Sequence, residues 1–82
     1  MDLARDPKQL GNQIRRARRK LRWSQKQLGE KTSLRQETIS LIESGNPATR
    51  IENILSVLAA LDLELQVAPR SKGWLSDLEK DF

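Results

Sequence analysis

The sequence predicts an all-α fold of four short helices, followed by a single β-strand. Two observations predict the helices: apolar residues recur about every 3.6 positions in several segments, and three of these segments follow residues that cap helix N-termini. A third observation predicts the strand, because at Asp62 the apolar period changes from about 3.6 to about 2. With 82 residues, the chain has room for one small domain and a short tail.

The first helix is predicted over residues 7–22. Asp6 is a suitable N-cap, Pro7 suits the first helical position, and Gln9 stands where a capping box needs an amide. The residues expected to face the core recur at helical spacing: Leu10, Ile14, Ala17 and Leu21. The other faces are crowded with arginine and lysine.

The second helix is predicted over residues 25–32, because Ser24 and Gln27 form a second capping box. Trp23, which precedes this helix, is interpreted as a packing residue at the end of the first helix rather than as a residue that stacks on a base.

The third helix is predicted from Gln36 to Ser44. Ile39 and Ile42 are expected to face inward, and Gly45 is expected to end the helix. The remaining residues of this helix are mostly polar, so its outward face is available for recognition.

The fourth helix is predicted to open with a third capping box, formed by Thr49 and Glu52. Its apolar set is Ile51, Ile54, Leu55, Leu58 and Leu61.

The strand is predicted just after the fourth helix, where apolar and polar residues alternate. Leu63, Leu65 and Val67 would form its buried face. A lone strand has no partner inside an otherwise helical chain, so we expect it to pair with the strand of a second copy in a homodimer. Residues 1–68 therefore form one predicted domain that includes the dimerisation strand, and residues 69–82 form a linker and a flexible tail.

Charge is unevenly distributed along the chain. Residues 1–72 carry 14 Lys and Arg against 8 Asp and Glu, and from Pro7 to Gly29 there are eight cations and no acid. A basic body of this kind is typical of a protein that binds a polyanion. Residues 73–82 carry three acids and one lysine, which indicates a separate role for that end.

The composition excludes several classes of site. The chain has no Cys and no His, so we expect no disulfide, metal or cofactor, and oligomerisation remains as added support for a small core. No catalytic constellation is evident, so an enzyme is not expected. The chain has one Phe, two Trp and no Tyr, too few aromatic platforms to favour RNA binding. No apolar run reaches the roughly 18 residues of a membrane span, so we expect no membrane partner and a cytoplasmic protein.

The predicted helix over residues 25–32, the turn after it and the polar helix from Gln36 form the helix-turn-helix arrangement of DNA-binding proteins. Residues 1–68 are therefore the predicted DNA-binding and dimerisation domain, and the polar residues of the two helices are assigned to phosphates and bases. The helix N-terminus at Ser24, Gln25 and Lys26 suits a phosphate group, because unpaired N–H groups and partial positive charge gather there. Thr38 is assigned to phosphate as well.

The first turns of the third helix are expected to contact base edges in the major groove. The predicted base-contacting residues are Arg35, Gln36, Glu37 and Ser40. Glutamine bonds bidentately to adenine, and arginine to guanine. Glu37 either accepts a hydrogen bond from cytosine N4 or weakens binding by repelling phosphate, and the sequence leaves both readings open.

The stretch "SQKQLGEKTSLRQETISLIESG" resembles the Cro/repressor (XRE) helix-turn-helix family, and the resemblance covers roughly residues 8–62. It implies a lambda-repressor-like domain in which Gln25 binds phosphate and braces Gln36, the principal base reader. It also implies an ion pair between Arg18 and Glu43. The chain departs from the family at Ser33, where glycine is most common, and a non-glycine residue at positive φ costs about 1 kcal/mol.

The order of elements narrows the resemblance to HipB-type antitoxins. The strand "LDLELQVAPR" after four helices and the tail with an aromatic residue carry this resemblance. It implies a strand lid across the dimer axis, binding to an inverted-repeat operator, repression of the chain's own toxin–antitoxin operon, and a HipA-type serine/threonine kinase toxin as partner. It also implies a nucleoid-associated bacterial protein. The alternative is a stand-alone Cro-like regulator without a toxin partner.

The tail is the expected toxin-binding segment. Its apolar residues are Trp74, Leu75, Leu78 and Phe82. Leu75, Leu78 and Phe82 would share one face of a short helix that orders on binding, with the aromatic residues as anchors.

Overall fold

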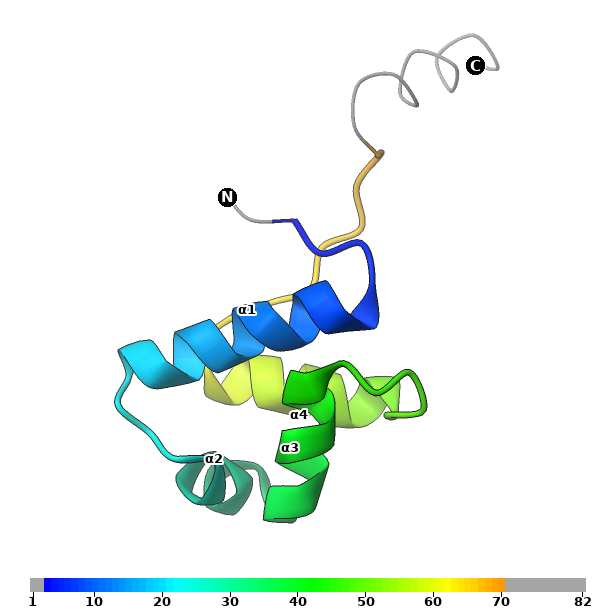
Figure 1. The fold of residues 1–82 in the computed structure, drawn as a ribbon. Helices are drawn as coiled ribbons and strands as arrows, with labels where there is room; N and C mark the ends of the chain where they lie inside the picture. The colour runs from blue at the N-terminus through cyan, green and yellow to red at the C-terminus, as the bar shows by residue number, and fades with distance from the viewer. Residues whose placement is uncertain (1–2, 71–82) are drawn as a thin grey trace, which may run out of the picture.

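The computed structural model describes residues 3–70, which form four helices: α1 (Pro7–Lys20), α2 (Gln25–Thr32), α3 (Gln36–Ser44) and α4 (Ile51–Ala60). Figure 1 shows α1 above α4, with α3 crossing in front of α4 toward α1 and α2 beside the beginning of α3. The expected all-helical, four-helix domain is confirmed for the described part of the chain. None of the helices within residues 3–70 is long and apolar enough to cross a membrane.

The core lies where the four helices meet. Its buried apolar residues are Ile14, Leu28, Ile39, Ile42, Val57, Leu58 and Leu61. Every helix contributes at least one of them, so the four helices share a single core.

α1 begins as predicted but ends earlier. Asp6 accepts a hydrogen bond from the backbone N–H of Gln9 at 2.7 Å, and Pro7 occupies the first turn. The helix ends at Lys20 rather than near residue 22, because Arg22 takes a left-handed conformation with φ of 61° and turns the chain. Leu21 is 47% exposed, so its predicted place in the core is wrong.

Trp23 has the packing role predicted for it. It lies partly buried against the core, and the Lys31 ammonium stands 4.5 Å from its ring centroid. Because Lys31 lies in the last turn of α2, the contact ties the α1–α2 connection to the far end of α2 and stabilises it by cation–π attraction.

α2 has the predicted capping box and a tight turn after it. Ser24 Oγ accepts from the Gln27 N–H at 3.0 Å, and Gln27 Oε1 accepts from the Ser24 N–H at 2.7 Å. Ser33 has φ of 59°, the left-handed conformation that the family's usual glycine would adopt without strain. Gly29 is required here, because a Cβ at this position would lie 2.7 Å from the Leu34 carbonyl oxygen.

α4 does not open with the predicted capping box. The Thr49 hydroxyl donates to the Asn46 carbonyl oxygen at 3.0 Å, and Arg50 occupies the N-cap position without a side-chain hydrogen bond. The polar loop therefore draws Thr49 into a local turn that competes with capping.

The inward face of α4 also differs from the prediction. Ile51 is 59% and Leu55 is 45% exposed, whereas Val57, which the periodicity reading left out, is fully buried. Leu58 and Leu61 are buried as expected. The outer face of α4 thus carries apolar residues that the single chain does not cover.

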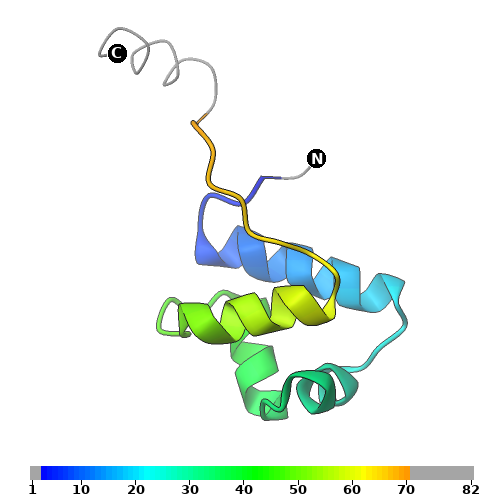
Figure 2. The same cartoon turned by 180° about the vertical axis from the view of Figure 1, so that it is seen from behind.

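After α4 the chain reverses and runs across α1. Asp62 has φ of 59°, and the Leu63 N–H donates to the Leu58 carbonyl oxygen at 2.8 Å, which closes the helix. Figure 2 shows the segment after α4 (yellow to orange) crossing α1 (blue). Residues 63–70 form neither helix nor strand in the single chain, so the strand stays a prediction that depends on a second copy. The predicted tail residues lie outside the described residues.

Candidate nucleic-acid interface

α3 separates its residues into two faces. Ile39, Ile42 and Glu43 are buried, with exposures of 0%, 3% and 1%, and they hold the helix to the domain. The opposite face is exposed and carries Gln36, Glu37, Ser40 and Leu41. The predicted base-contacting residues of the helix therefore lie together on its free face.

Glu43 anchors the end of α3 through an ion pair with α1. Arg18 Nε donates to Glu43 Oε2 at 2.6 Å, and Arg18 Nη2 donates to Oε1 at 3.0 Å. Arg18 Nη1 also donates to the carbonyl oxygen of Trp23 at 2.7 Å. The pair between Arg18 and Glu43 that the family resemblance implies is thus present and bidentate, the strongest form of such a pair.

Two further side chains meet the same carboxylate. Arg15 Nε donates to Glu43 Oε1 at 3.4 Å, and Gln25 Nε2 donates to that oxygen at 3.2 Å. α1, α2 and α3 are thereby joined at one buried group. Within residues 3–70 the Gln25 amide is held by Glu43 and has no hydrogen bond to Gln36, and the brace implied by the resemblance stays a prediction for the DNA-bound state.

The environment of Glu43 keeps it ionised. Burial alone would raise its pKa, but the hydrogen bonds from Arg18, Gln25 and Arg15 and the Arg18 charge together hold the pKa below its ordinary value of 4.5. A lowered pKa in the folded chain stabilises the fold above that ordinary value, and this contribution is lost as the pH falls through the folded-state pKa. The anchor therefore holds at neutral pH and weakens in acid.

α1 and the end of α3 approach each other closely enough to make this cluster. At Gly11, a Cβ would lie 2.5 Å from the carbonyl oxygens of both Ile42 and Glu43. A side chain at position 11 would push the helices apart, and the Arg18–Glu43 hydrogen bonds would lengthen.

The N-terminus of α2 has part of the geometry predicted for phosphate binding. Ser24 uses its hydroxyl oxygen as an acceptor for the helix cap, and Lys26 extends into solvent from the first turn. Gln25 is half-buried because its amide is held by Glu43. The residue types lie together at one helix end, and contact with phosphate stays a prediction.

Two more residues predicted to contact DNA, Arg35 and Thr38, lie at the start of α3 and differ in exposure. Arg35 is exposed at the N-cap position, and its carbonyl oxygen accepts from the N–H groups of Thr38 and Ile39. Thr38 is half-buried. Sequence reasoning missed Leu41, which is 46% exposed one turn after Glu37, and its helical spacing from Glu37 was the signal that would have found it.

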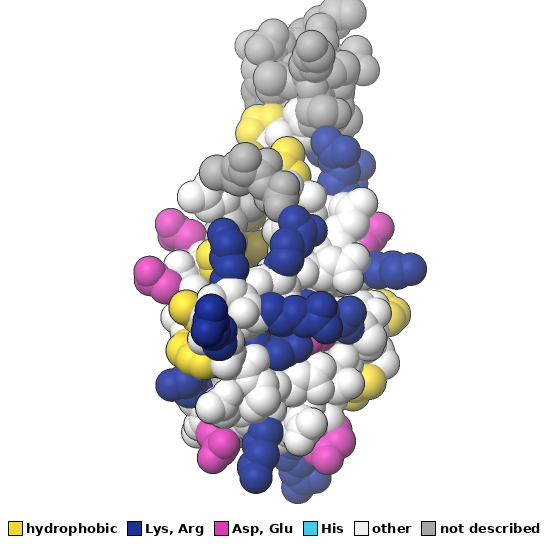
Figure 3. All heavy atoms as spheres, turned by 60° about the vertical axis from the view of Figure 1, so that its left-hand side comes forward, with side chains coloured by type: hydrophobic (Ala, Val, Ile, Leu, Met, Phe, Trp, Pro, Cys, Tyr) yellow, Lys and Arg dark blue, Asp and Glu magenta, His cyan; other side chains and the backbone are white. Residues whose placement is uncertain are grey.

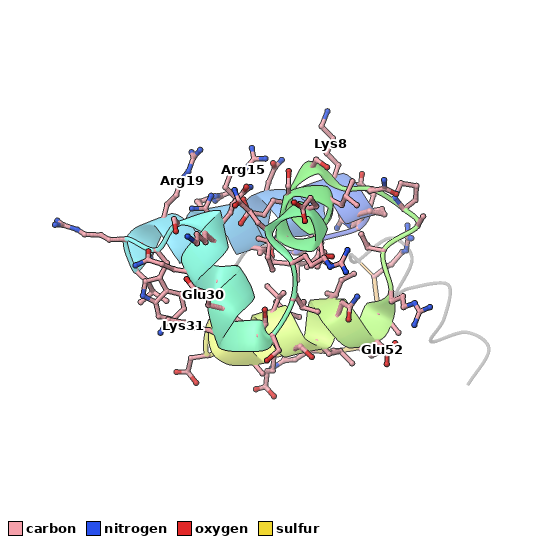
Figure 4. The ribbon with its side chains drawn as sticks, turned by 90° about the horizontal axis from the view of Figure 1, so that it is seen from below. Lys8, Arg15, Arg19, Glu30, Lys31 and Glu52 are labelled. Atoms are coloured by element: carbon pink, nitrogen blue, oxygen red, sulfur yellow. The ribbon has the colours of Figure 1, made fainter. Side chains whose placement is uncertain are left out.

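Part of the positive charge of α1 lies on one side of the domain. In Figure 3, Lys and Arg side chains spread across the middle of the face, and most acidic side chains lie toward its edges. Figure 4 shows Lys8, Arg15 and Arg19 pointing away from α4, whereas Glu52 lies on the α4 side. The acidic residues 73–82 lie outside the described residues, so the contrast between a basic body and an acidic end stays a prediction.

A helix-turn-helix family model matches residues 14–67 of the chain. No curated protein matches the sequence of this chain. Among solved structures, a chain of the HipA–HipB–O2–O3 complex is 25% identical with a TM-score of 0.80, covering 87% of this chain and all (100%) of that one. The HipB–O4 20mer complex gives the same four values.

A third structure, a HipB–O1–O2 complex, is 26% identical with a TM-score of 0.77, covering 83% of this chain and 99% of that one. These likenesses extend beyond the helix-turn-helix pair to the whole four-helix arrangement. Because the family model spans well over half of the chain, and α2, the turn and α3 have the geometry that it requires, the chain belongs to the XRE-type helix-turn-helix family of DNA-binding regulators.

Proposed function

We propose that this protein is a HipB-type antitoxin: a dimeric, sequence-specific DNA-binding protein that represses its own operon. The observation that carries the proposal is the free face of α3, a polar recognition surface on a helix whose other face is anchored by Glu43. The likeness to HipB structures in complexes named for O1, O2 and O4 supports operator DNA as the ligand.

In the proposed complex, the free face of α3 enters the major groove. Gln36 reads adenine, Arg35 reads guanine, and Ser40 and Glu37 contact neighbouring base edges. Leu41 adds an apolar side chain to this face, suited to the methyl group of thymine. Ser24, Gln25, Lys26 and Thr38 hold the flanking phosphates. This division assigns sequence preference to the free face of α3 and its N-cap residue, and general affinity to the N-terminus of α2 together with Thr38.

Gln36→Ala is expected to weaken operator binding by about 1–3 kcal/mol and to leave binding to random DNA unchanged, because a base contact carries sequence preference. The matched control is Lys26→Ala, which should weaken binding to all sequences alike and reduce the salt dependence by about one unit of slope per bound protomer. Fluorescence anisotropy with an operator selected from a random pool would measure both. An equal loss on random DNA for Gln36→Ala would remove its base-reading role.

The homodimer is proposed from the apolar residues that the single chain leaves uncovered. Leu63 is 42%, Leu65 47% and Val67 98% exposed, in a segment without internal strand pairing. Pairing these segments across a twofold axis would bury the three side chains and satisfy the backbone groups that face each other across the pair. A twofold dimer fits an inverted-repeat operator with half-sites one helical turn, or a multiple of it, apart.

The toxin partner is proposed from the likeness to the HipA–HipB–O2–O3 complex together with the apolar tail. Deleting residues 73–82, or changing Trp74 and Phe82 together to Ala, is expected to weaken binding to a HipA-type kinase. Operator affinity should stay within about twofold, because the acidic tail is unsuited to phosphate. Calorimetry with the kinase and anisotropy with the operator would separate the two activities.

The outcome of that deletion also separates this function from the alternative. Unchanged kinase affinity would place the toxin interface on the helical body. A full-length chain that binds its operator and no kinase would instead be a stand-alone Cro-like regulator.

A further inference from the structure

We propose that α1 carries a second phosphate-binding surface, formed by Lys8, Arg15 and Arg19, which contacts the backbone of the same duplex that α3 reads. We call these three residues the α1 basic stripe. The inference rests on the proposed DNA-binding function and extends it to a helix outside the helix-turn-helix pair.

The stripe is a single row on one face of α1. Its members are separated by seven and four positions, which return to nearly the same angle at 3.6 residues per turn. Figure 4 shows all three side chains pointing to the same side, away from α4. At about 1.5 Å per residue the row is about 16 Å long, enough to follow several phosphates of one strand.

The stripe is continuous with the α2 N-terminus. Arg15 and Gln25 both donate to Glu43 Oε1, at 3.4 Å and 3.2 Å, so the middle of the stripe lies beside a residue already assigned to phosphate. The Arg15 side chain keeps 37% of its surface exposed while its Nε is held. An arginine fixed in this way loses less side-chain entropy when it binds a phosphate.

The stripe also lies beside the end of α3. A Cβ at Gly45, the residue that terminates α3, would meet the backbone of Lys8 at 2.5 Å. The row of cations therefore starts at the C-terminal end of the recognition helix and passes the N-terminus of α2. A duplex seated on α3 would bring its backbone along this path.

The local charge favours a polyanion as the ligand of the stripe. The sequence from Pro7 to Gly29 contains no acid, Glu43 is buried and paired with Arg18, and the Asp6 carboxylate before Lys8 accepts the Gln9 N–H at the helix cap. None of the exposed large apolar residues of the described chain lies between Lys8 and Arg19. A protein interface is usually built around an apolar centre and depleted of lysine, whereas phosphate binding needs only placed cations.

The test uses two variants of the stripe: a double variant, Lys8→Gln with Arg19→Gln, and a triple variant that adds Arg15→Gln. Both are compared with a control, Arg50→Gln. Arg50 is an exposed cation at the start of α4, paired only with Glu52 across a surface contact of 3.3 Å. The affinity of each protein is measured between 50 and 200 mM salt (roughly the range over which phosphate contacts are resolved) on a selected operator and on a random duplex.

The stripe predicts a slope lower by about one unit per substitution in each bound protomer, equal on both duplexes, with unchanged base preference. Arg50→Gln should keep the original slope. Thermal unfolding checks that each variant folds, and the double variant avoids Arg15, whose loss also disturbs Glu43. An unchanged slope in the folded double variant that still prefers its operator overturns the stripe alone. Failure of the unaltered protein to enrich any duplex from a random pool overturns the proposed function instead.

Discussion

Arg18→Ala is expected to reduce the free energy of unfolding by about 3–5 kcal/mol, because it leaves the buried Glu43 carboxylate without its bidentate partner. A small domain has about 5–15 kcal/mol in total, so the variant should unfold at a much lower urea concentration. Urea denaturation followed by circular dichroism at neutral pH measures the loss.

The control for this prediction is the exposed pair of Arg50 and Glu52, whose side chains are 78% and 70% exposed. Arg50→Gln should change stability by no more than about 1 kcal/mol, since solvent screens surface pairs. Acid provides a second check: the stability advantage of the unaltered chain over Glu43→Gln should shrink as the pH falls through the lowered pKa of Glu43. If Arg18→Ala proves as stable as Arg50→Gln, Glu43 does not anchor α3.

Leu65→Glu is expected to dissociate the proposed dimer and to lower operator affinity by at least about a hundredfold. Two glutamates would face each other at the twofold axis in a site without water, which is costly for charged groups. Separate protomers then lose the effective-concentration advantage of bivalent binding to the two half-sites. Analytical ultracentrifugation measures the oligomeric state, and anisotropy measures the affinity.

The matched variant is Glu64→Gln, which alters the neighbouring side chain on the opposite face of the predicted strand and should leave the dimer intact. A dimer that persists in Leu65→Glu would contradict the strand lid. The uncovered Ile51 and Leu55 on α4 would then be the next surface to test.

Much of the fold followed from the sequence because helix starts and apolar spacing are local signals. Asp6 and Ser24 cap their helices as predicted, since each side chain finds the nearby N–H that its position requires. Thr49 fits the same pattern and does not cap, because the Asn46 carbonyl lies within reach of its hydroxyl. Local pattern does not determine which of two local hydrogen bonds forms.

The apolar faces were predicted less well than the helices. Leu21, Ile51 and Leu55 have the right spacing and lie exposed, whereas Val57 is buried outside the predicted set. Spacing defines a stripe on each helix, but the neighbouring helices decide how much of that stripe is covered. Apolar residues beyond the reach of the neighbouring helices therefore stay exposed in the single chain.

The candidate site was predictable where it depends on spacing within one helix, and not where it depends on contacts between helices. The exposed residues of α3 lie where helical spacing put them, and the resemblance supplied the Arg18–Glu43 pair. The convergence of Arg15 and Gln25 on the same carboxylate was not predictable from spacing, because it depends on how closely α1 and α3 approach at Gly11. The connection from α2 to the α1 basic stripe follows from that contact.

The two faces of α3 have a consequence for how such a regulator evolves. The side chains proposed to read bases are exposed, whereas Ile39, Ile42 and Glu43, which hold the helix in place, are buried. A lineage therefore changes its target one residue at a time without passing through an unstable intermediate, since surface substitutions away from anchoring contacts have small effects on stability. Duplicated copies can thus diverge into regulators that bind different DNA sequences while the helical fold stays the same.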